Sequence, residues 1–471
     1  DTARLRENDL RRYHGVAGTE TMRVGSESCL RKLFSFVHSR HGVNAFYSTA
    51  SVAEGPRHFC RDQVIIDGKQ YVPSDQCNLT SRILEHTTRK LHLKECHPLH
   101  LLKRRISDYF AEKYTSRRGN PSFSVYDRLS PVVTQEQNFD SLLVPASHPS
   151  RCKSDSYYIN DELMLRAHTS AHQRDLVKAG LDAFLVVGDV YRRDEVDRHH
   201  YPVFHQIEGV RLFSADELFP GGSYGLSLFE SSNREADKQG LHTREAAKLL
   251  EHSLKTCLQG LAQQLLGPAT EIRWVPTYFP FTHPSWELEA KFQGEWLELL
   301  GCGIMEQEIL FNAGVEHKVG WAFGVGLERL AMALYSIPDI RVFWSTDPAF
   351  LAQFEHNDPY RPVIFRALSN HPPCLADMSF WVPPEFAPND FFDLVRSCGS
   401  DLVERVELRD TFVHPKTQRT SYCYRLVYRH MERALVQEEA NAVHRLIVFM
   451  CADVGAVSFS RTFQSLGTVT G

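Results

Sequence analysis

An α+β fold with more than one domain is predicted by three observations. The 471 residues leave room for two or three domains and a large core. The periodicity of apolar residues changes along the chain, which marks helices in some segments and strands in others. After a polar, proline-containing stretch at 346–362, the order of elements is strand, helix, strand, strand, helix. This is the ferredoxin-like pattern, which needs one more strand to close.

The first helix, at 98–114, is predicted by apolar residues at intervals of three and four, with a proline suited to its first turn. A strand-rich stretch that contains Pro131 follows. A second helix is predicted to begin at Thr169 or Ser170, which suit an N-cap, and to end at Gly180.

The middle of the chain contains strand signals, one long helix and a hairpin. The helix is amphipathic and stops at a Gly-Pro pair, and a tight Gln-Gly turn joins the two hairpin strands. The predicted elements are strands at 184–187, 190–194 and 203–213, a helix at 241–266, strands at 286–292 and 296–300, and a helix at 327–337.

The C-terminal part gives the ferredoxin-like order. Its predicted elements are a strand at 376–382, a helix at 389–398, strands at 403–409 and 421–428, and a helix at 437–449. Residues 451–471 follow no expected pattern, so we treat them as an atypical tail, and the closing strand is left open.

Composition excludes several classes of protein. The apolar fraction of 42% and the charged fraction of 24% are those of an ordinary globular protein. No stretch reaches the ~20 consecutive apolar residues of a membrane span, so we expect no membrane insertion. A net charge of −5 argues against a DNA-coating protein but does not exclude local RNA-binding patches. The 11 cysteines lack zinc or disulfide spacing and fit free thiols in a reducing compartment.

Residues 1–58 form an N-terminal extension of different composition. Between Met22 and Ser51 the segment is rich in serine, and its Lys and Arg side chains face a single acid, Glu27. Basic, serine-rich and acid-poor composition is typical of a mitochondrial transit peptide, and the alternative is a disordered tail. Met22 is a candidate start residue, in which case residues 1–21 would be an upstream artefact.

The segment Val203–Val210, VFHQIEGV, offers a candidate binding face. Alternate side chains of a strand share a face, so Phe204, Gln206 and Glu208 lie together, opposite a face that includes His205. An aromatic ring can stack on a base, and the amide and carboxylate can fix an ammonium group. The alternative is an exposed strand face with incidental polar residues.

Two arginines are candidate phosphate ligands. Arg192 shares a face with Asp194, and its planar fork can make two hydrogen bonds to a phosphate. Arg329 lies in the first turn of the helix that follows Gly324-x-Gly326, where glycines permit close approach. The alternative for Arg192 is a surface salt bridge. The alternative for the segment before Arg329 is a helix start whose glycines serve only for packing. Neither a dinucleotide fingerprint nor a Walker loop is present.

Phe279 and Phe281 flank a proline and, if extended, would wall an apolar pocket from one side, although such aromatics can also be core residues. Glu287, Glu289 and Glu298 lie on neighbouring predicted strands. They could hold Mg²⁺ through oxygen ligands or form a solvated face.

Basic and aromatic residues alternate in the C-terminal part, between 411 and 433. Such side chains on strands suit single-stranded RNA, through phosphate contacts and base stacking, while the alternative is a solvated strand face. The candidate RNA ligands are Lys416, Arg419, Tyr422, Tyr424, Arg425 and Arg429.

These pieces occur in the order Pro131, YRRD, FHQIEG and GVGLERLAM. In this order they resemble the region of the three signature motifs of class II aminoacyl-tRNA synthetases. The class I signatures HIGH and KMSKS are absent. The segments HPLHLLKR, NFDSLLVPASHPSR, LRAHTSAHQ, YFPFTHPSWE and GWAFGVGLERLAM resemble phenylalanyl-tRNA synthetases in the single-chain mitochondrial form. This resemblance covers roughly residues 60–449.

The resemblance implies an antiparallel-sheet catalytic domain at 59–345, a linker at 346–362 and a ferredoxin-like anticodon-binding domain at 363–450. It implies charging of tRNA(Phe) with L-phenylalanine and ATP, with Mg²⁺, by a monomer in the mitochondrial matrix. The alternatives are a non-catalytic tRNA-binding paralogue, and a relative with another amino-acid substrate or with no tRNA.

The resemblance also implies roles for single residues. Arg192 and Arg329 would be the catalytic pair. The implied ATP ligands are Arg192, Asp194, His199, His200, Phe204, His205, Glu298 and Arg329, with Glu298 also contacting the metal. The implied amino-acid ligands are His168, Thr169, Ser170, Ala171, Gln206, Glu208, Phe279, Phe281, Ala322 and Phe323.

Overall fold

The computed structural model describes residues 63–220, 226–292, 294–356, 358–366, 371–431, 433–453 and 458–459. The predicted transit peptide and most of the predicted tail therefore lie outside the described residues. Among the described residues, no helix is both long and apolar enough to cross a membrane.

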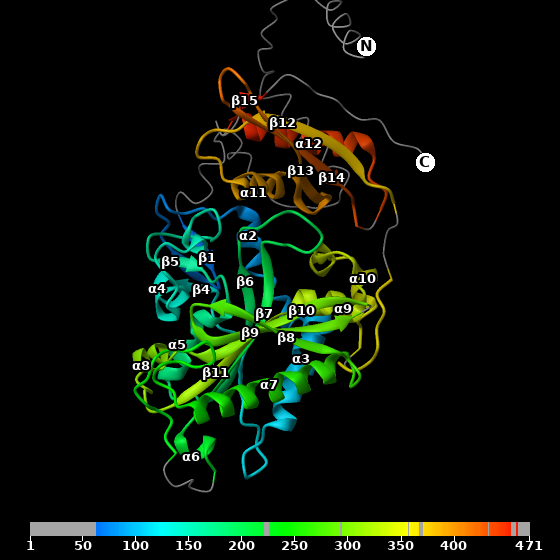
Figure 1. The fold of residues 1–471 in the computed structure, drawn as a ribbon. Helices are drawn as coiled ribbons and strands as arrows, with labels where there is room; N and C mark the ends of the chain where they lie inside the picture. The colour runs from blue at the N-terminus through cyan, green and yellow to red at the C-terminus, as the bar shows by residue number, and fades with distance from the viewer. Residues whose placement is uncertain are drawn as a thin grey trace, which may run out of the picture. The chain divides into compact units, whose positions relative to one another are not determined.

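A seven-stranded sheet organises the larger, N-terminal part of the described chain, in the order β3-β6-β7-β11-β10-β9-β8 (Figure 1). All neighbouring pairs are antiparallel except β3 and β6. The antiparallel fold expected from the sequence is thus present. The strands are β3 (Ser124–Tyr126), β6 (Ala183–Tyr191), β7 (Val203–Phe213), β8 (Ile272–Phe279), β9 (Thr282–Phe292), β10 (Glu295–Met305) and β11 (Val319–Gly326).

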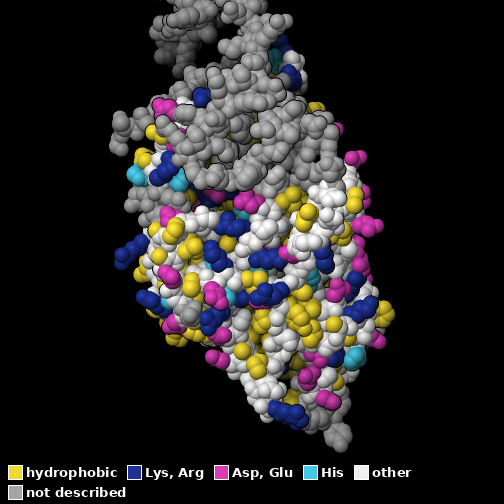
Figure 2. Space-filling view, turned by 180° about the vertical axis from the view of Figure 1, so that it is seen from behind, with side chains coloured by type: hydrophobic (Ala, Val, Ile, Leu, Met, Phe, Trp, Pro, Cys, Tyr) yellow, Lys and Arg dark blue, Asp and Glu magenta, His cyan; other side chains and the backbone are white. Residues whose placement is uncertain are grey.

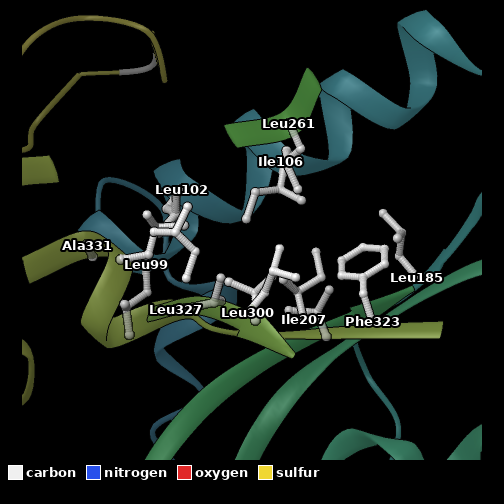
Figure 3. Packing of buried hydrophobic residues seen from close by; sticks show 14 of the residues in the cluster. Leu99, Leu102, Ile106, Leu185, Ile207, Leu261, Leu300, Phe323, Leu327 and Ala331 are labelled. Carbon is white, nitrogen blue, oxygen red and sulfur yellow. The ribbon is translucent and has the colours of Figure 1, made fainter. Parts of the chain in front are cut away.

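Helices α3 (Pro98–Lys113), α7 (Arg244–Leu266) and α9 (Leu327–Tyr335) bury one face of this sheet. The predicted stripe of α3 is buried, and Figure 3 shows Leu99, Leu102 and Ile106 in the cluster that also contains Ile207 of β7. Odd-numbered residues of β7 and β11 point into this cluster, which leaves the even-numbered ones for the opposite face.

The opposite face is covered only in part. Short helices η5 (Thr169–His172), α5 (Gln173–Lys178) and α8 (Gln307–Asn312) pack there around a second, smaller core. The predicted continuous helix from 169 to 180 is therefore a 3-10 turn followed by one short α-helix. Gly180, with φ of +88°, ends it as expected.

The remaining elements of this part are short and frame the sheet. They are β1 (Val64–Ile66), β2 (Lys69–Tyr71), α2 (Ser81–His86), η2 (Leu91–Leu93), β4 (Val132–Thr134), α4 (Gln135–Asn138), η3 (Asp140–Leu142), η4 (Pro149–Arg151), β5 (Leu163–Leu165), α6 (Ala215–Leu218), η6 (Ile340–Trp344) and α10 (Pro348–Ala352).

The predicted linker at 346–362 is not a free connection. It contains α10, and Phe350 and Phe354 are fully buried in the first core. Two buried phenylalanines anchor this stretch, so it packs with the core of the seven-stranded sheet.

The C-terminal part is a four-stranded antiparallel sheet in the order β13-β14-β12-β15. Its two-residue strand β15 pairs with β12 and supplies the closing strand that the ferredoxin-like pattern requires. The elements are β12 (Cys374–Trp381), α11 (Pro388–Gly399), η7 (Ser400–Leu402), β13 (Val403–Val413), β14 (Thr420–Tyr428), α12 (Gln437–Asp453) and β15 (Ser458–Phe459).

Candidate active site

Open space lies over the even-numbered face of β7, beside Gly324 and Gly326 of β11, and we call this space the hollow. Gly324 is the register partner of Glu208, and Gly326 is the partner of Gln206. A Cβ atom at either glycine would meet no atom within 4 Å. The two glycines therefore leave open space next to the amide and the carboxylate that the sequence places on one face.

Glu208 is a buried carboxylate surrounded by neutral donors. Its side chain accepts hydrogen bonds from the Ser170 hydroxyl, from the Gln173 amide and, at 3.3 Å, from the Thr169 hydroxyl. Only 3% of the residue is exposed. Burial raises the pKa of Glu208 to about 7, although the three hydrogen bonds oppose the shift. No cation forms an ion pair with this carboxylate among the described residues.

Gln206 and His168 continue the polar rim. The Gln206 carbonyl oxygen accepts a hydrogen bond from the backbone N–H of Thr169 at 3.3 Å. Burial and the neighbouring charge of Arg192 lower the pKa of His168 to about 3, so its ring is neutral at physiological pH. The His168 ring lies 6.4 Å from the ring of Phe281.

Two stacked aromatic rings form the apolar side. Phe279 ends β8, Phe281 lies in the turn to β9, and their ring centroids are 5.7 Å apart with planes 7° from parallel. A Cβ at Gly301 would come within 2.8 Å of the Phe279 ring, so this position needs a glycine. Ala322, 5% exposed, lies on the same face of β11 as the glycines.

Two arginines and an aromatic ring lie at the other end of the hollow. The Arg192 guanidinium is 5.2 Å from the ring centroid of Phe204, and its Nε donates to the Ala167 carbonyl at 2.8 Å. Arg329 lies 3.5 Å from a Glu298 oxygen and 3.4 Å from Nε2 of His200. The arrangement is electropositive and adjoins a stacking surface, which suits a nucleotide with its phosphates.

The loop between β6 and β7 carries the other predicted nucleotide ligands. Asp197 accepts from the backbone N–H groups of His199 and His200, and its second oxygen bonds the His200 ring at 2.7 Å. This bond raises the pKa of His200. Asp194 accepts from the backbone N–H of Glu195 at 2.8 Å.

Residues of the C-terminal part bond to this loop. The Asp194 carbonyl accepts from Arg396 at 2.6 Å, and Arg198 donates to Glu404 at 2.9 Å. Arg193, which points away from Arg192, donates to Asp393 at 2.6 Å. The loop conformation therefore depends on partners about two hundred positions later in the sequence.

A buried arginine contacts the end of η5. Arg166 donates to the Asp189 carboxylate at 3.0 Å and lies 2.9 Å from Nε2 of His172. A Cβ at Gly188 would approach the Arg166 guanidinium to 1.9 Å. The glycine therefore makes room for the arginine, which lies two positions before His168.

Three of the predicted ligands are wrongly placed by the sequence interpretation. His205 is fully buried behind the sheet, where it bonds to Glu328. Phe323 also points to that side and stacks on Phe110 at 5.5 Å between centroids. Ala171 is 1% exposed and packs in the second core. These side chains do not reach the hollow, since strand alternation or core packing directs them elsewhere.

One contributor, Gln173, was missed by the sequence interpretation. Its amide donates to Glu208, and it follows Ser170 by three positions at the start of α5. The segment LRAHTSAHQ ends on this residue, so a helical spacing of three from Ser170 was the available signal.

Glu298 is half-exposed, so its carboxylate oxygens are accessible from the solvent. Mg²⁺ is commonly held by one or two carboxylates plus substrate phosphates. No group of three or more His, Cys, Asp or Glu residues suited to a metal occurs among the described residues. Glu289 forms a hydrogen bond with Arg273.

The predicted RNA ligands of the C-terminal part are separated by strand alternation. Tyr424 is 3% exposed and packs against Phe391 in the domain core, and Tyr422 is partly buried on the same side. They cannot serve as an open stacking surface, which corrects the prediction. Arg425 makes two hydrogen bonds of 2.8 Å to Asp377, and Arg429 lies 2.6 Å from a Glu404 oxygen.

A different aromatic group lies on the other side of β14. Trp381, Ser421 and Phe412 are register partners across three strands. The ring of Phe412, a residue 49% exposed, lies 6.2 Å from that of Trp381. The ring of His414 is about as close to both, the Arg419 guanidinium lies 5.2 Å from the Trp381 ring, and Lys416 is exposed in the adjoining turn. We call Trp381, Phe412 and His414 the aromatic platform.

Charges of both signs are interspersed over the part of the molecule that contains the seven-stranded sheet in the view from behind (Figure 2). That view does not present one continuous basic surface.

Comparison with known proteins gives consistent matches over most of the chain. Residues 84–216 and 240–354 match the family described as tRNA synthetases class II core domain (F), and residues 369–457 match the ferredoxin-fold anticodon binding domain. A Mus musculus protein named "Phenylalanine--tRNA ligase, mitochondrial" is 58% identical over 383 residues, which cover 81% of this chain and 85% of the relative.

More distant relatives extend the match. A Drosophila melanogaster protein named "Probable phenylalanine--tRNA ligase, mitochondrial" is 50% identical, with 88% of this chain and 96% of the relative covered. A Saccharomyces cerevisiae protein named "Phenylalanine--tRNA ligase, mitochondrial" is 35% identical, with 87% and 96% covered.

Proposed function

Because the chain belongs to the family of mitochondrial phenylalanine–tRNA ligases, we propose that the hollow on β7 is where it activates phenylalanine with ATP. The protein is a class II aminoacyl-tRNA synthetase that joins phenylalanine to tRNA in mitochondria. The non-catalytic alternative finds no support in these relatives.

The observation that carries the proposed site is the buried Glu208 without a counter-charge. A carboxylate bonded only to neutral donors is stabilised when a cation arrives, and the amino group of phenylalanine is such a cation. Ser170, Gln173 and Thr169 hold the carboxylate in position. Gln206 and His168 lie beside it and would contact the other polar atoms of the amino acid.

The stacked rings of Phe279 and Phe281 would receive the phenyl ring. Their parallel arrangement leaves ring faces and edges for aromatic contact, and Ala322 would close the end of the pocket. An apolar pocket rejects a ring that bears one extra hydroxyl by only ~10²-fold, so we expect weak activation of tyrosine.

ATP would lie across Phe204, Arg192 and Arg329. The phenylalanine carboxylate attacks the α-phosphate in line, and pyrophosphate leaves. A loose transition state of this kind needs positioning and neutralisation of charge, which the two arginines can provide. Asp194, His199 and His200 line the loop nearby. Mg²⁺ would be held by Glu298 and the phosphate oxygens, where it would neutralise phosphate charge.

In the second step, the terminal ribose of tRNA attacks the adenylate carbonyl and AMP leaves. We propose that the C-terminal domain holds tRNA(Phe) through its aromatic platform, with Lys416 and Arg419 at the phosphates. Arg425 and Arg429 would act mainly within the domain, because each faces a carboxylate at 2.8 Å or less.

We further propose that the chain acts as a monomer in the mitochondrial matrix. The resemblance to the single-chain form supports this proposal. Sedimentation at working concentration would test the first part, since a dimer would sediment at twice the expected mass.

The test of the proposed function is amino-acid-dependent exchange of labelled pyrophosphate into ATP, scanned over all twenty amino acids. Exchange with phenylalanine, and weakly with tyrosine, is the expected result. Exchange with a different amino acid would support adenylate formation but contradict the assignment of phenylalanine to the pocket. Loss of exchange in Glu208→Ala with ATP binding retained would place the amino acid as proposed.

A further inference from the structure

The contact between Glu328 and His205 joins the two elements that carry the proposed nucleotide ligands. His205 follows Phe204 on β7, and Glu328 precedes Arg329 in the first turn of α9. One Glu328 oxygen accepts from the His205 backbone N–H at 2.8 Å. The other accepts from Nδ1 of the His205 ring at 2.7 Å.

This contact extends the β7–β11 pairing past the point where the backbone leaves the sheet. The last register pair is Gly326 with Gln206, and the chain turns into α9 at Leu327. The next backbone donor of β7 on this side, His205 N–H, would have no strand partner. A glutamate carboxylate takes the place of the missing backbone carbonyl.

Both side chains of this contact are buried. The His205 side chain is 0% exposed and the Glu328 side chain 2% exposed. Nε2 of His205 is buried without a hydrogen-bond partner among the described residues, so Glu328 is the ring's polar partner there. The ring also packs beside Trp344, at 5.9 Å between centroids.

Apart from Glu328, the first turn of α9 is fixed by packing, since Leu327 is fully buried in the first core. Its N-cap residue, Gly326, has no side chain to cap the helix. Arg329 itself is half-exposed, and its contacts with Glu298 and His200 are long, at 3.5 and 3.4 Å. The position of Arg329 relative to Phe204 is therefore set through the first turn of α9, where Leu327 packs in the first core and Glu328 bonds to His205.

We propose that Glu328 and His205 are positioning residues that set the spacing between Phe204 and Arg329, and so the affinity for ATP. Neither touches substrate. The inference rests on the proposed placement of ATP between those two side chains. A contact of this kind should affect the KM for ATP more than the KM for phenylalanine. Glu208 is held by its own hydrogen bonds, and the rings of Phe279 and Phe281 stack on each other, so neither depends on this contact.

Two substitutions of His205 separate this role from simple packing. In His205→Asn the amide nitrogen takes roughly the place of Nδ1 and can still donate to Glu328. In His205→Gln the amide nitrogen takes the place of Nε2, which bonds to nothing here, although the side-chain volume is closer to that of histidine. Packing alone favours the glutamine, and the positioning role favours the asparagine.

The measurement is pyrophosphate exchange with ATP varied and phenylalanine saturating, then the reverse, with Tm recorded for each variant. We expect His205→Gln to raise the KM for ATP about tenfold, the equivalent of ~1.4 kcal/mol, and His205→Asn to recover most of that loss. The KM for phenylalanine should stay within about twofold in both.

Glu328→Gln gives a second test that does not depend on the histidine. The near-isosteric amide still accepts from the backbone N–H but faces the Nδ1 proton with a donor or forces the ring to change tautomer. We expect a rise of about tenfold in the KM for ATP. Tyr109→Phe, which removes a buried 2.6 Å hydrogen bond to the Cys257 carbonyl between α3 and α7, is the control for stability loss alone.

Equal KM values for ATP in the two His205 variants, or an unchanged value in Glu328→Gln, would overturn the inference. Arg329→Ala distinguishes its failure from that of the ATP site. If Arg329→Ala leaves the KM for ATP unchanged, the proposed ATP site is wrong. If it raises that KM while the other variants do not, only the positioning role is wrong.

Discussion

The central strands β7 and β14 both present charged side chains, but their charges are satisfied in opposite ways. Glu208 on β7 is 3% exposed and is bonded to neutral donors only. Arg425 on β14 makes two 2.8 Å hydrogen bonds to a carboxylate and is about one-quarter exposed. A buried charge without its counter-charge indicates a place for a ligand, whereas a paired one mainly stabilises its own domain.

The largest expected effect comes from removing the charge of Glu208. Glu208→Gln keeps the shape but deprives the phenylalanine ammonium of its partner, a loss of ~2–5 kcal/mol for a buried charge pair. We expect kcat/KM for phenylalanine in pyrophosphate exchange to fall by about 100-fold or more. Asp377→Asn on β12, which removes the charge that faces Arg425 of β14, is the matched control, and an equal fall there would contradict the comparison.

The pH dependence of phenylalanine binding should follow Glu208. The pKa of Glu208 in the folded protein, about 7, lies above the usual value for a glutamate. Protonation of Glu208 therefore stabilises the folded, unliganded protein. This stabilisation is complete below the unfolded pKa and is lost as pH rises through about 7. Ammonium binding needs the ionised form, so the KM for phenylalanine should fall about tenfold between pH ~6 and ~8.

Exchange kinetics at several pH values would measure this dependence, with Glu208→Gln as the control that should abolish it. A KM for phenylalanine that rises with pH over the same interval would contradict the assignment.

Trp381→Ala should weaken tRNA binding without affecting activation. Base–aromatic stacking contributes ~1–3 kcal/mol per base, so the KM for tRNA should rise about tenfold. Pyrophosphate exchange, which needs no tRNA, should be unchanged. A tRNA KM equal to that of the unaltered protein would remove the aromatic platform from the proposed RNA-binding surface.

The smallest effect is expected for Arg425→Ala. A partly exposed ion pair contributes ~0–1 kcal/mol, so Tm should fall slightly and the tRNA KM should change less than in Trp381→Ala. If Arg425→Ala instead weakens tRNA binding more than Trp381→Ala does, the arginine leaves its carboxylate partner to contact RNA.

Several features of the site followed from local rules. Strand alternation at 203–210 predicted that Phe204, Gln206 and Glu208 share a face, and the structure places them together. The conformation of Gly294 and the end of α7 before Gly267 also agree with local turn and capping signals, with φ of +92° at Gly294 and +105° at Gly267.

The wrong assignments arose where a ligand role implied by a motif was also given to residues next to the true candidates. His205 and Phe323 adjoin residues that line the hollow, yet alternation directs both side chains behind the sheet. The same rule applied to β14 would have separated Tyr424 from Arg425. Sequence alone could therefore have corrected these three assignments.

Other features needed the tertiary structure. Helical spacing marks Gln173 as a neighbour of Ser170, but no local pattern shows that it reaches Glu208, thirty-five positions later, or that Asp377 pairs with Arg425. Phe350 and Phe354 lie in a polar stretch, and only their packing shows that it belongs to the catalytic core. Long-range contacts of this kind depend on the assembled sheet.

The close approach of Gly188 to Arg166 has a consequence for evolutionary variation. Any side chain at 188 would overlap the guanidinium, which would be displaced from Asp189 and His172. The two positions should therefore covary. In relatives where residue 188 is larger than glycine, residue 166 should be shorter than arginine. A larger residue at 188 together with arginine at 166 should occur only where Asp189 has also been replaced.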